Sequence, residues 1–209
     1  MQVDRPAVGE ELHDGPPTVP RQAATVILLR GGREALEVLL VRRNPAARFM
    51  PGAWVFPGGA VDAAEGEGDA AHRAAAVREA REEAGIELPD PDALVRFSRW
   101  ITPRRLRIRY DTHFFLAPLP EGAEPRVDGG EVVDARWYAP AAALEAFRAG
   151  EIELVFPTLK HLEQLARFAG ADALLEWASG REVEPVEPAV VLDGEVARVV
   201  LPGEPGYVA

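Results

Sequence analysis

The chain of 209 residues contains no cysteine. Disulfide bonds, thiolate nucleophiles and zinc sites with cysteine ligands are therefore excluded. Lysine is almost as scarce, because Lys160 is the single lysine and all other basic side chains are arginines. We attribute this preference for arginine to genomic composition and not to function.

Positive charge is also in short supply, since the formal net charge is -11 at pH 7. Affinity for nucleic acids depends on clustered Lys and Arg, so we expect no nucleic-acid partner. A small anionic ligand is not excluded, because a local basic pocket can oppose the overall charge.

Long hydrophobic runs are missing as well. No apolar stretch approaches the roughly 20 residues that a membrane-spanning helix needs. Residues 1–20 lack the basic and apolar regions of a signal peptide. We therefore predict a cytoplasmic protein with no membrane partner.

The remaining composition is that of a globular protein, with 47% hydrophobic and 27% charged residues. We expect one main domain. Residues 1–20 are rich in Pro, Gly and acidic side chains, and are predicted to form a flexible N-terminal arm. Residues 21–170 are assigned to the domain, and residues 171–209 to a C-terminal extension that packs on it or lies at a dimer contact.

The patterning predicts a mixed α/β fold. Two apolar runs separated by Gly-Gly-Arg-Glu indicate a hairpin, and a short strand ends in Pro-Gly-Gly. Asp69 is the expected cap of a helix that runs to Ala84 and ends at Gly85. The predicted strands are 23–30, 35–43, 54–59, 93–102, 107–119 and 131–139; the later helices are 140–149, 158–169 and one near 171–179; a hairpin with an Asp-Gly turn closes the chain.

Three glutamates lie on one face of the predicted first helix. Glu79, Glu82 and Glu83 stand at i, i+3 and i+4. Like charges so placed cost helix stability, which Arg78 and Arg81 offset in part. A solvated surface helix is one interpretation. The other is a site for Mg²⁺ or Mn²⁺, because carboxylate oxygens are the ligands that hard divalent cations prefer.

The residues around these glutamates resemble the signature of the Nudix hydrolases, G-x5-E-x7-R-E-U-x-E-E-x-G-U, in which U is aliphatic. One departure lies in the middle: residues 66 to 77, twelve in all, separate Glu65 from Arg78 where the pattern has seven. Asp62, Glu67 and Asp69 therefore compete with Glu65 for its place. The matching positions are Gly59, Glu65, Arg78, Glu79, Ala80, Glu82, Glu83, Gly85 and Ile86.

The resemblance implies an α/β/α sandwich and an enzyme that hydrolyses a nucleoside diphosphate linked to another group with a divalent metal. Glu82 and Glu83 would be metal ligands. Glu79 would be a ligand or the base that activates water, and Arg78 would hold the carboxylates in place. Glu131 occupies a position where many members of the family place a further glutamate near the metals, so a catalytic role and a plain surface position both stay open. The resemblance also favours a homodimer.

Residues 39–59 resemble the signature of the branch of this family that cleaves coenzyme A. Just before the Nudix signature, proteins of this branch carry the pattern L-L-T-x-(R/T)-(S/A)-x3-R-x3-G-x3-F-P-G-G. Val41 and Asn44 depart from it. The matching positions are Leu39, Leu40, Arg43, Arg48, Gly52, Phe56, Pro57, Gly58 and Gly59.

Coenzyme A carries a 3′-phosphate besides its diphosphate, so arginines are expected in its pocket. Arg42, Arg43 and Arg48 are candidates beside the Nudix signature. A second basic group contains Arg104, Arg105, Arg107 and Arg109. Arg107 and Arg109 would share one face of a strand, and the group would either bind substrate or consist of solvated residues of an edge strand. The four histidines lack ligand spacing, and His113 is expected to be a core or wall residue.

The sequence therefore predicts a Nudix-type diphosphatase that cleaves coenzyme A or acyl-CoA with Mg²⁺ or Mn²⁺. The products would be 3′,5′-ADP and (acyl-)4′-phosphopantetheine. One alternative keeps the enzyme class but changes the nucleotide substrate to ADP-ribose or NADH. The other is a catalytically weak nucleotide-binding sensor, which the enlarged loop keeps open. The predicted site residues are Arg78, Glu79, Glu82, Glu83 and Glu131, with Arg43, Arg48, Gly58, Gly59, Arg107 and Arg109 for the substrate.

Overall fold

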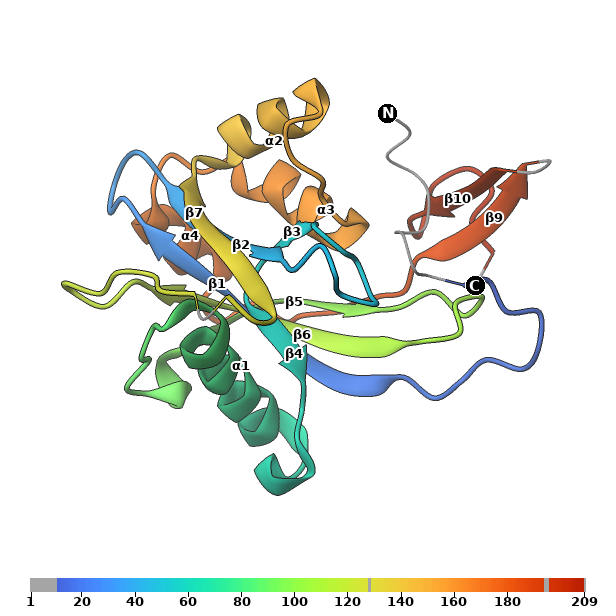
Figure 1. Ribbon diagram of the computed structural model, residues 1–209, viewed down its shortest axis with the longest axis horizontal. Coiled ribbons are helices and arrows are strands. Elements are labelled where there is room, and N and C mark those ends of the chain that lie inside the picture. Colours follow the sequence, from blue (N-terminus) through green and yellow to red (C-terminus); the bar gives the residue numbers. More distant parts are fainter. Residues whose placement is uncertain (1–10, 128, 194–195, 209) are drawn as a thin grey trace.

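The computed structural model describes residues 11–127, 129–193 and 196–208 (Figure 1). Its central strand is β1 (Arg21–Arg30), which β6 (Tyr110–Pro118) pairs in parallel along nearly its whole length. The other edge of β1 is shared, with β2 (Glu37–Arg43) at one end and β4 (Gly58–Ala60) at the other, both antiparallel. The sheet therefore splits where β2 and β4 part.

The other strands extend this sheet on both sides. Pairing with β2 are β3 (Trp54–Val55) and β7 (Val132–Tyr138). On the far side β5 (Val95–Ile101) pairs with β6, and β8 (Pro185–Val186) pairs in parallel with β5. The predicted α/β fold with a mixed sheet is confirmed.

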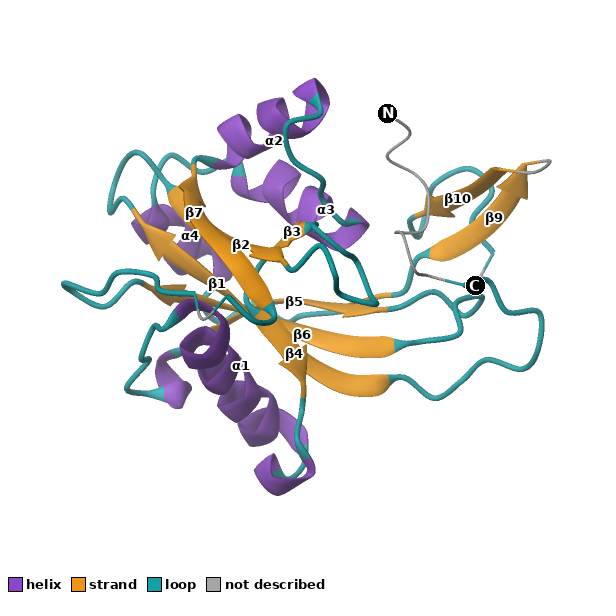
Figure 2. Cartoon of the chain, in the orientation of Figure 1, coloured by secondary structure: helices purple, strands orange, loops and turns teal. Residues whose placement is uncertain are grey.

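Helices cover both faces of the sheet (Figure 2). The α1 helix (Gly68–Ala84) covers one face, and α2 (Pro140–Ala149), α3 (Phe156–Leu165) and α4 (Ala171–Ala178) cover the other. Side chains of β1 alternate between two cores: Val26 and Leu28 pack toward α1, while Ile27 and Leu29 pack toward the other helices. Both faces are buried, which explains why the strand is a continuous apolar run.

The α1 helix lies close to the sheet because its inner face is made of alanines, among them Ala75, Ala76 and Ala80. Its end at Gly85 is confirmed: this glycine is left-handed, with φ of 66°, and its N–H bonds the carbonyls of Ala80 and Arg81. The predicted cap was wrong, because the N-cap is Glu67.

Asp69 lies inside the first turn of α1. Its carboxylate accepts hydrogen bonds from the guanidinium groups of Arg73 and Arg96 and is not available to the helix end. The connections before and after α1 contain two short 3-10 helices, η1 (Ala63–Glu65) and η2 (Pro91–Ala93).

The single strand predicted over 54–59 was wrong, because β3 and β4 are separate strands that pair with β2 and β1. Other boundaries also differ from the prediction. The β6 strand begins at Tyr110, so Arg107 and Arg109 lie in the connection after β5 and share no strand face. The α3 helix begins and ends a few residues early, because Val155 precedes a Pro at its first turn and Ala166 closes it.

The ends of the chain pack on the domain where they are described. Leu12 bridges Leu106, so residues 11–20 run along the connection between β5 and β6. Leu174 of α4 is fully buried in the core. The hairpin β9 (Ala189–Asp193) and β10 (Val196–Val200) closes the chain, while its predicted turn at Gly194 lies outside the described residues. Within the described part, every helix is too short or too polar to cross a membrane.

Candidate active site

The predicted glutamate face lies where β4, η1 and α1 follow one another at the split of the sheet. The backbone N–H of Gly58 donates to Glu83 Oε2 over 2.9 Å. Gly59 lies against the carboxylate of Glu79, and a β-carbon there would overlap it. Two glycines therefore let the strand approach both carboxylates of the helix.

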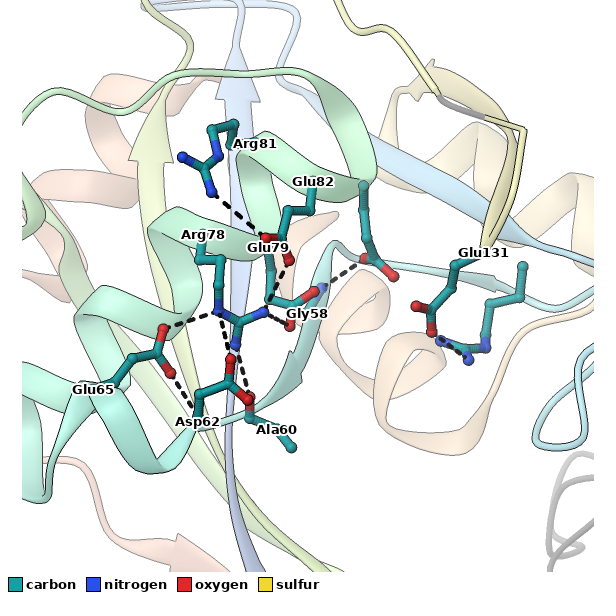
Figure 3. Close-up of polar contacts among 11 residues, drawn as sticks. Gly58, Ala60, Asp62, Glu65, Arg78, Glu79, Arg81, Glu82 and Glu131 are labelled. Atoms are coloured by element: carbon teal, nitrogen blue, oxygen red, sulfur yellow. Dashed lines mark hydrogen bonds and ion pairs between the residues drawn. The ribbon is translucent and has the colours of Figure 1, made fainter.

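Arg78 is the centre of this arrangement (Figure 3). Its guanidinium donates to the carboxylates of Glu65, Glu79 and Glu82 over 3.0, 2.6 and 3.1 Å, and to the carbonyl of Ala60 over 2.8 Å. One planar group with five donors can satisfy all four acceptors, which a lysine could not. Arg78 thus fixes the orientation of the glutamates relative to β4 and η1.

Two of the three glutamates of α1 are buried. Glu79 and Glu83 are 9% and 5% exposed, whereas Glu82 is exposed. Burial raises the pKa of Glu83 to about 8, although the N–H of Gly58 works against this shift. Burial likewise raises the pKa of Glu79, and Arg78 opposes it. The neighbouring positive charges therefore do not fully offset the burial of the carboxyl groups of Glu79 and Glu83.

Glu131 and Arg43 reach the same region from the strand side. Glu131 directly precedes β7, Arg43 ends β2, and Arg43 Nη2 donates to Glu131 Oε1 over 3.0 Å. The charge of Glu131 contributes to the raised pKa of both Glu79 and Glu83. Figure 3 shows Glu131 facing the glutamates of α1 across this space.

The donors gathered here suit a hard divalent cation in their chemistry, since all are carboxylate oxygens and buried acid favours a bound cation. Among the described residues, however, no three His, Asp or Glu side chains are arranged to hold a metal ion together. Arg78 explains this, because it bonds both Glu79 and Glu82. Joint coordination by the three glutamates would require Glu82 to leave Arg78.

A cavity of about 310 Å³ on the strand side is lined by Glu131 and by Gly58 and Gly59, the two glycines that contact Glu83 and Glu79. One end of the cavity is polar and the rest is largely apolar. In the apolar part, the ring centroids of Phe49 and Tyr110 lie 6.3 Å apart. The lining includes Arg43, Gly58, Gly59 and Glu131 at the polar end, and Phe49, Met50, Val55, Phe56, Phe114 and Val155 in the walls.

The predicted substrate residues fall into two groups. Arg43, Gly58 and Gly59 lie together on this cavity, whereas Arg48, Arg107 and Arg109 do not line it. Arg48 is exposed, and Arg107 is exposed with an ion pair to Glu11.

Arg109 is buried, and its guanidinium is used within the protein. It donates to the carbonyls of Thr102 and Thr18 and to the carboxylate of Glu187 over 2.6 Å. These contacts join the N-terminal arm, the connection after β5 and the C-terminal extension.

The enlarged loop leaves Glu65 beside Arg78. Glu65 Oε1 lies 3.0 Å from Arg78 Nε, while Asp62 is at 3.7 Å and Asp69 pairs with other arginines. Glu67 is the exposed N-cap of α1. The residues between Glu65 and Arg78 form a turn and then the start of α1, and Gly66 and Gly68, both with positive φ, are the sequence signal for that turn.

A second, larger cavity of about 480 Å³ lies elsewhere, between the start of α1 and the strands β5 and β6. Its lining lacks Gly58, Gly59 and Glu131, which connect the first cavity to the glutamates of α1, so we do not assign it to the chemistry. His72 and His113 stack there with ring centroids 3.8 Å apart, a contact that the sequence did not indicate. As predicted, His113 is a wall residue.

Sequence reasoning also missed the aromatic and apolar residues of the first cavity, chiefly Phe49, Met50 and Tyr110. Nothing in the local pattern separates them from ordinary core residues. Their place on the cavity depends on the contact between the connection from β2 to β3 and the start of β6.

Comparisons with known proteins agree with this geometry. A family model described as the NUDIX domain matches residues 19–157. The chain is similar to acyl-coenzyme A diphosphatase NUDT19 of Homo sapiens, with 27% identity covering 90% of this chain and 80% of that protein. It is also similar to putative nudix hydrolase 7 of Caenorhabditis elegans, with 25% identity covering 90% and 75%.

Among solved structures, the chain is similar to a NUDIX hydrolase from Alicyclobacillus acidocaldarius. The TM-score is 0.69 at 29% identity, and the match covers 76% of this chain and 96% of that one. The fold is therefore similar to that of a known NUDIX hydrolase.

Proposed function

Because the chain belongs to the Nudix family of hydrolases, which act on anhydride bonds, we propose that its substrate is the diphosphate of coenzyme A or of an acyl-CoA. The cofactor in this proposal is Mg²⁺ or Mn²⁺. The products are 3′,5′-ADP and 4′-phosphopantetheine or its acyl derivative. The substrate is a small nucleotide derivative, and a homodimer stays a prediction that sedimentation of the purified protein can test.

One observation carries the proposal most strongly. Arg43, Gly58 and Gly59, three positions of the coenzyme A signature, line the same cavity next to the buried Glu79 and Glu83. Relatives named acyl-coenzyme A diphosphatase, matched over 90% of this chain, add support for this branch.

A bound divalent metal would neutralise the diphosphate and lower the pKa of the attacking water. Glu82 and Glu83 are assigned as its ligands, with Glu79 as a third ligand or as the base. Arg78 holds Glu79 against β4. Arg43 lies at the polar end of the cavity, where its guanidinium can exchange Glu131 for an oxygen of the diphosphate.

In the proposed reaction, the oxygen of water forms a bond to one phosphorus of the diphosphate. The bond from that phosphorus to the bridging oxygen breaks, and the electron pair leaves with the other phosphate. A carboxylate takes the proton of the water, and we assign this role to Glu79 or Glu131. Glu131 suits this role because it is exposed and is freed when Arg43 turns to the substrate.

The test is to incubate the protein with Mg²⁺ or Mn²⁺ and with coenzyme A, acyl-CoAs, ADP-ribose and NADH in turn, and to identify the products by mass. We expect 3′,5′-ADP from coenzyme A and acyl-CoAs. Addition of EDTA should abolish its release. If only ADP-ribose or NADH is cleaved, the protein is a hydrolase but coenzyme A is not its substrate.

Two variants locate the chemistry. Glu82→Gln removes a proposed metal ligand and should lower kcat/KM by about 100-fold, because metal stabilisation of the transition state is worth several kcal/mol. Glu87→Gln is the matched control, since Glu87 is an exposed glutamate just beyond the same helix. Equal rates for both variants would remove Glu82 from the site.

A further inference from the structure

The cavity beside the glutamates suits only one of the two limbs of coenzyme A, because the limbs differ in charge. On one side of the diphosphate lies adenosine with a charged 3′-phosphate, and on the other lies pantetheine, which has methyl, hydroxyl and amide groups and no charge. On the premise of the proposed function, we propose that this cavity receives the pantetheine limb and that the 3′-phosphoadenosine limb stays outside it.

The charges of the lining support this orientation. Arg43 is the one basic side chain among the described residues that line the cavity, and it is already paired with Glu131 at 3.0 Å and with the carbonyl of Phe49. A 3′-phosphate inside would find no second cation and would face the carboxylate of Glu131. A buried phosphate without such a partner is costly, whereas an uncharged limb carries no such penalty.

The walls match the chemistry of pantetheine. Phe49, Met50 and Phe114 provide apolar surface for its methyl and methylene groups. Thr102, Thr112 and Thr158 bring hydroxyls to the same lining, where they can bond amide and hydroxyl groups.

The volume of about 310 Å³ limits what can enter. If each non-hydrogen atom takes about the 30 Å³ of a water molecule in the liquid, the cavity holds on the order of ten such atoms. Coenzyme A is several times larger. The part of pantetheine next to the diphosphate therefore fills the cavity, and the thiol with any acyl group extends beyond it.

Met50 is held in an unusual conformation at this wall. Its φ is 50°, in the left-handed region, and it precedes Pro51, which disfavours helical conformations in the preceding residue. Such strain persists where the surrounding structure imposes it, commonly at ligand sites. The flexible Met side chain suits a wall that adapts to the branched start of pantetheine.

The experiment compares inhibition of coenzyme A hydrolysis by the two products, 4′-phosphopantetheine and 3′,5′-ADP. Thr112→Phe places a ring in the cavity from β6, a strand that tolerates aromatic residues. We expect the inhibition constant of 4′-phosphopantetheine to rise by about tenfold or more, as changes of pocket volume typically produce, and that of 3′,5′-ADP to stay unchanged. The opposite pattern would overturn the inference.

The matched control is His113→Phe, the next residue of β6, which lines the other cavity. It should alter neither inhibition constant. Met50→Ala is the second probe, because Met50 is half-buried in a connection and its truncation leaves the core intact. It should weaken inhibition by 4′-phosphopantetheine alone. If Met50→Ala weakened inhibition by both products equally, the inference would also be overturned.

The two proposals fail in different ways. If the wild-type protein leaves coenzyme A and acyl-CoAs intact, the proposed function is wrong and this inference falls with it. If coenzyme A is cleaved and the variants in the cavity affect only 3′,5′-ADP, the function stands and the orientation of the substrate is reversed.

Discussion

Gly59 lies so close to the carboxylate of Glu79 that the backbone of β4 and the side chain of α1 are in direct contact. A β-carbon at this position would overlap Glu79 Oε1. Glu79 cannot move freely away, because Arg78 Nη1 bonds the same oxygen over 2.6 Å. The glycine therefore sets the position of a proposed metal ligand.

Gly59→Ala should consequently displace Glu79 and lower kcat/KM. A misplacement of about 1 Å at a reacting group can cost about 100-fold, and we expect an effect of that size. The measurement is kcat/KM for coenzyme A, together with a thermal melt to show that the variant is folded.

Gly15→Ala is a suitable control for this prediction. Neither glycine has a positive φ, and at Gly15 the obstacle is the half-buried side chain of His13, which can move aside. Normal activity in Gly59→Ala would mean that Glu79 has no required position.

Arg78 and Glu65 provide a second prediction. Glu65→Gln removes a charge that Arg78 Nε contacts at 3.0 Å, so Arg78 should hold Glu79 and Glu82 less firmly. We expect kcat/KM to fall by about tenfold, the lower range for loss of a residue that orients a ligand. Glu67→Gln, at an exposed glutamate, should have no effect. If Glu67→Gln lowered kcat/KM more than Glu65→Gln, Glu67 and not Glu65 would be the first glutamate of the Nudix signature.

The catalytic helix could be predicted because its information is local. Glu79, Glu82, Glu83 and Gly85 lie within seven positions, and their spacing matches one face and one end of a helix. The alternation at Arg107 and Arg109 was equally local and misleading. The partner that decides the place of Arg109 is Glu187, 78 positions away, and no short pattern encodes that contact.

The cavity shows the same limit. Arg43 and Glu131 could each be named as candidates from the sequence, but they are 88 positions apart. Their ion pair follows from the antiparallel register of β2 and β7, in which Arg43 faces Val132. That register depends on how the strands pack and not on either segment alone.

Arg109 should be required for stability and not for substrate. Arg109→Met removes the buried partner of Glu187 and two bonds to backbone carbonyls, so the free energy of unfolding should fall by about 3 kcal/mol. Denaturant unfolding measures this loss. The KM for coenzyme A of the folded variant should be unchanged, and a raised KM with unaltered stability would return Arg109 to the substrate site.

Arg107→Met is the comparison for this prediction. Arg107 is exposed and its ion pair with Glu11 spans 3.4 Å, so its loss should change the free energy of unfolding by less than about 0.5 kcal/mol.

The last prediction concerns pH and the buried His161. Its ring is 1% exposed, contacts the ring of Phe114 with centroids 4.3 Å apart, and has Ser98 Oγ at 2.7 Å from Nε2. Burial lowers the pKa of this imidazole from 6.5 to about 3. Between these two values the unfolded chain binds a proton that the folded protein does not. The free energy of unfolding should therefore carry no penalty from His161 above pH 6.5. As the pH drops from 6.5 toward 3, it should fall by up to about 1.4 kcal/mol per pH unit for this group.

Burial also lowers the pKa of His72 and of His113, the latter to about 4, so both add to the slope in the same direction. The double variant His161→Phe with Ser98→Ala isolates one contribution, because it removes the imidazole and its polar partner together. Urea unfolding between pH 7.5 and pH 5 should show a shallower decline for the double variant than for the wild type. Identical slopes would mean that His161 is protonated in the folded protein, which the aromatic surroundings of its ring disfavour.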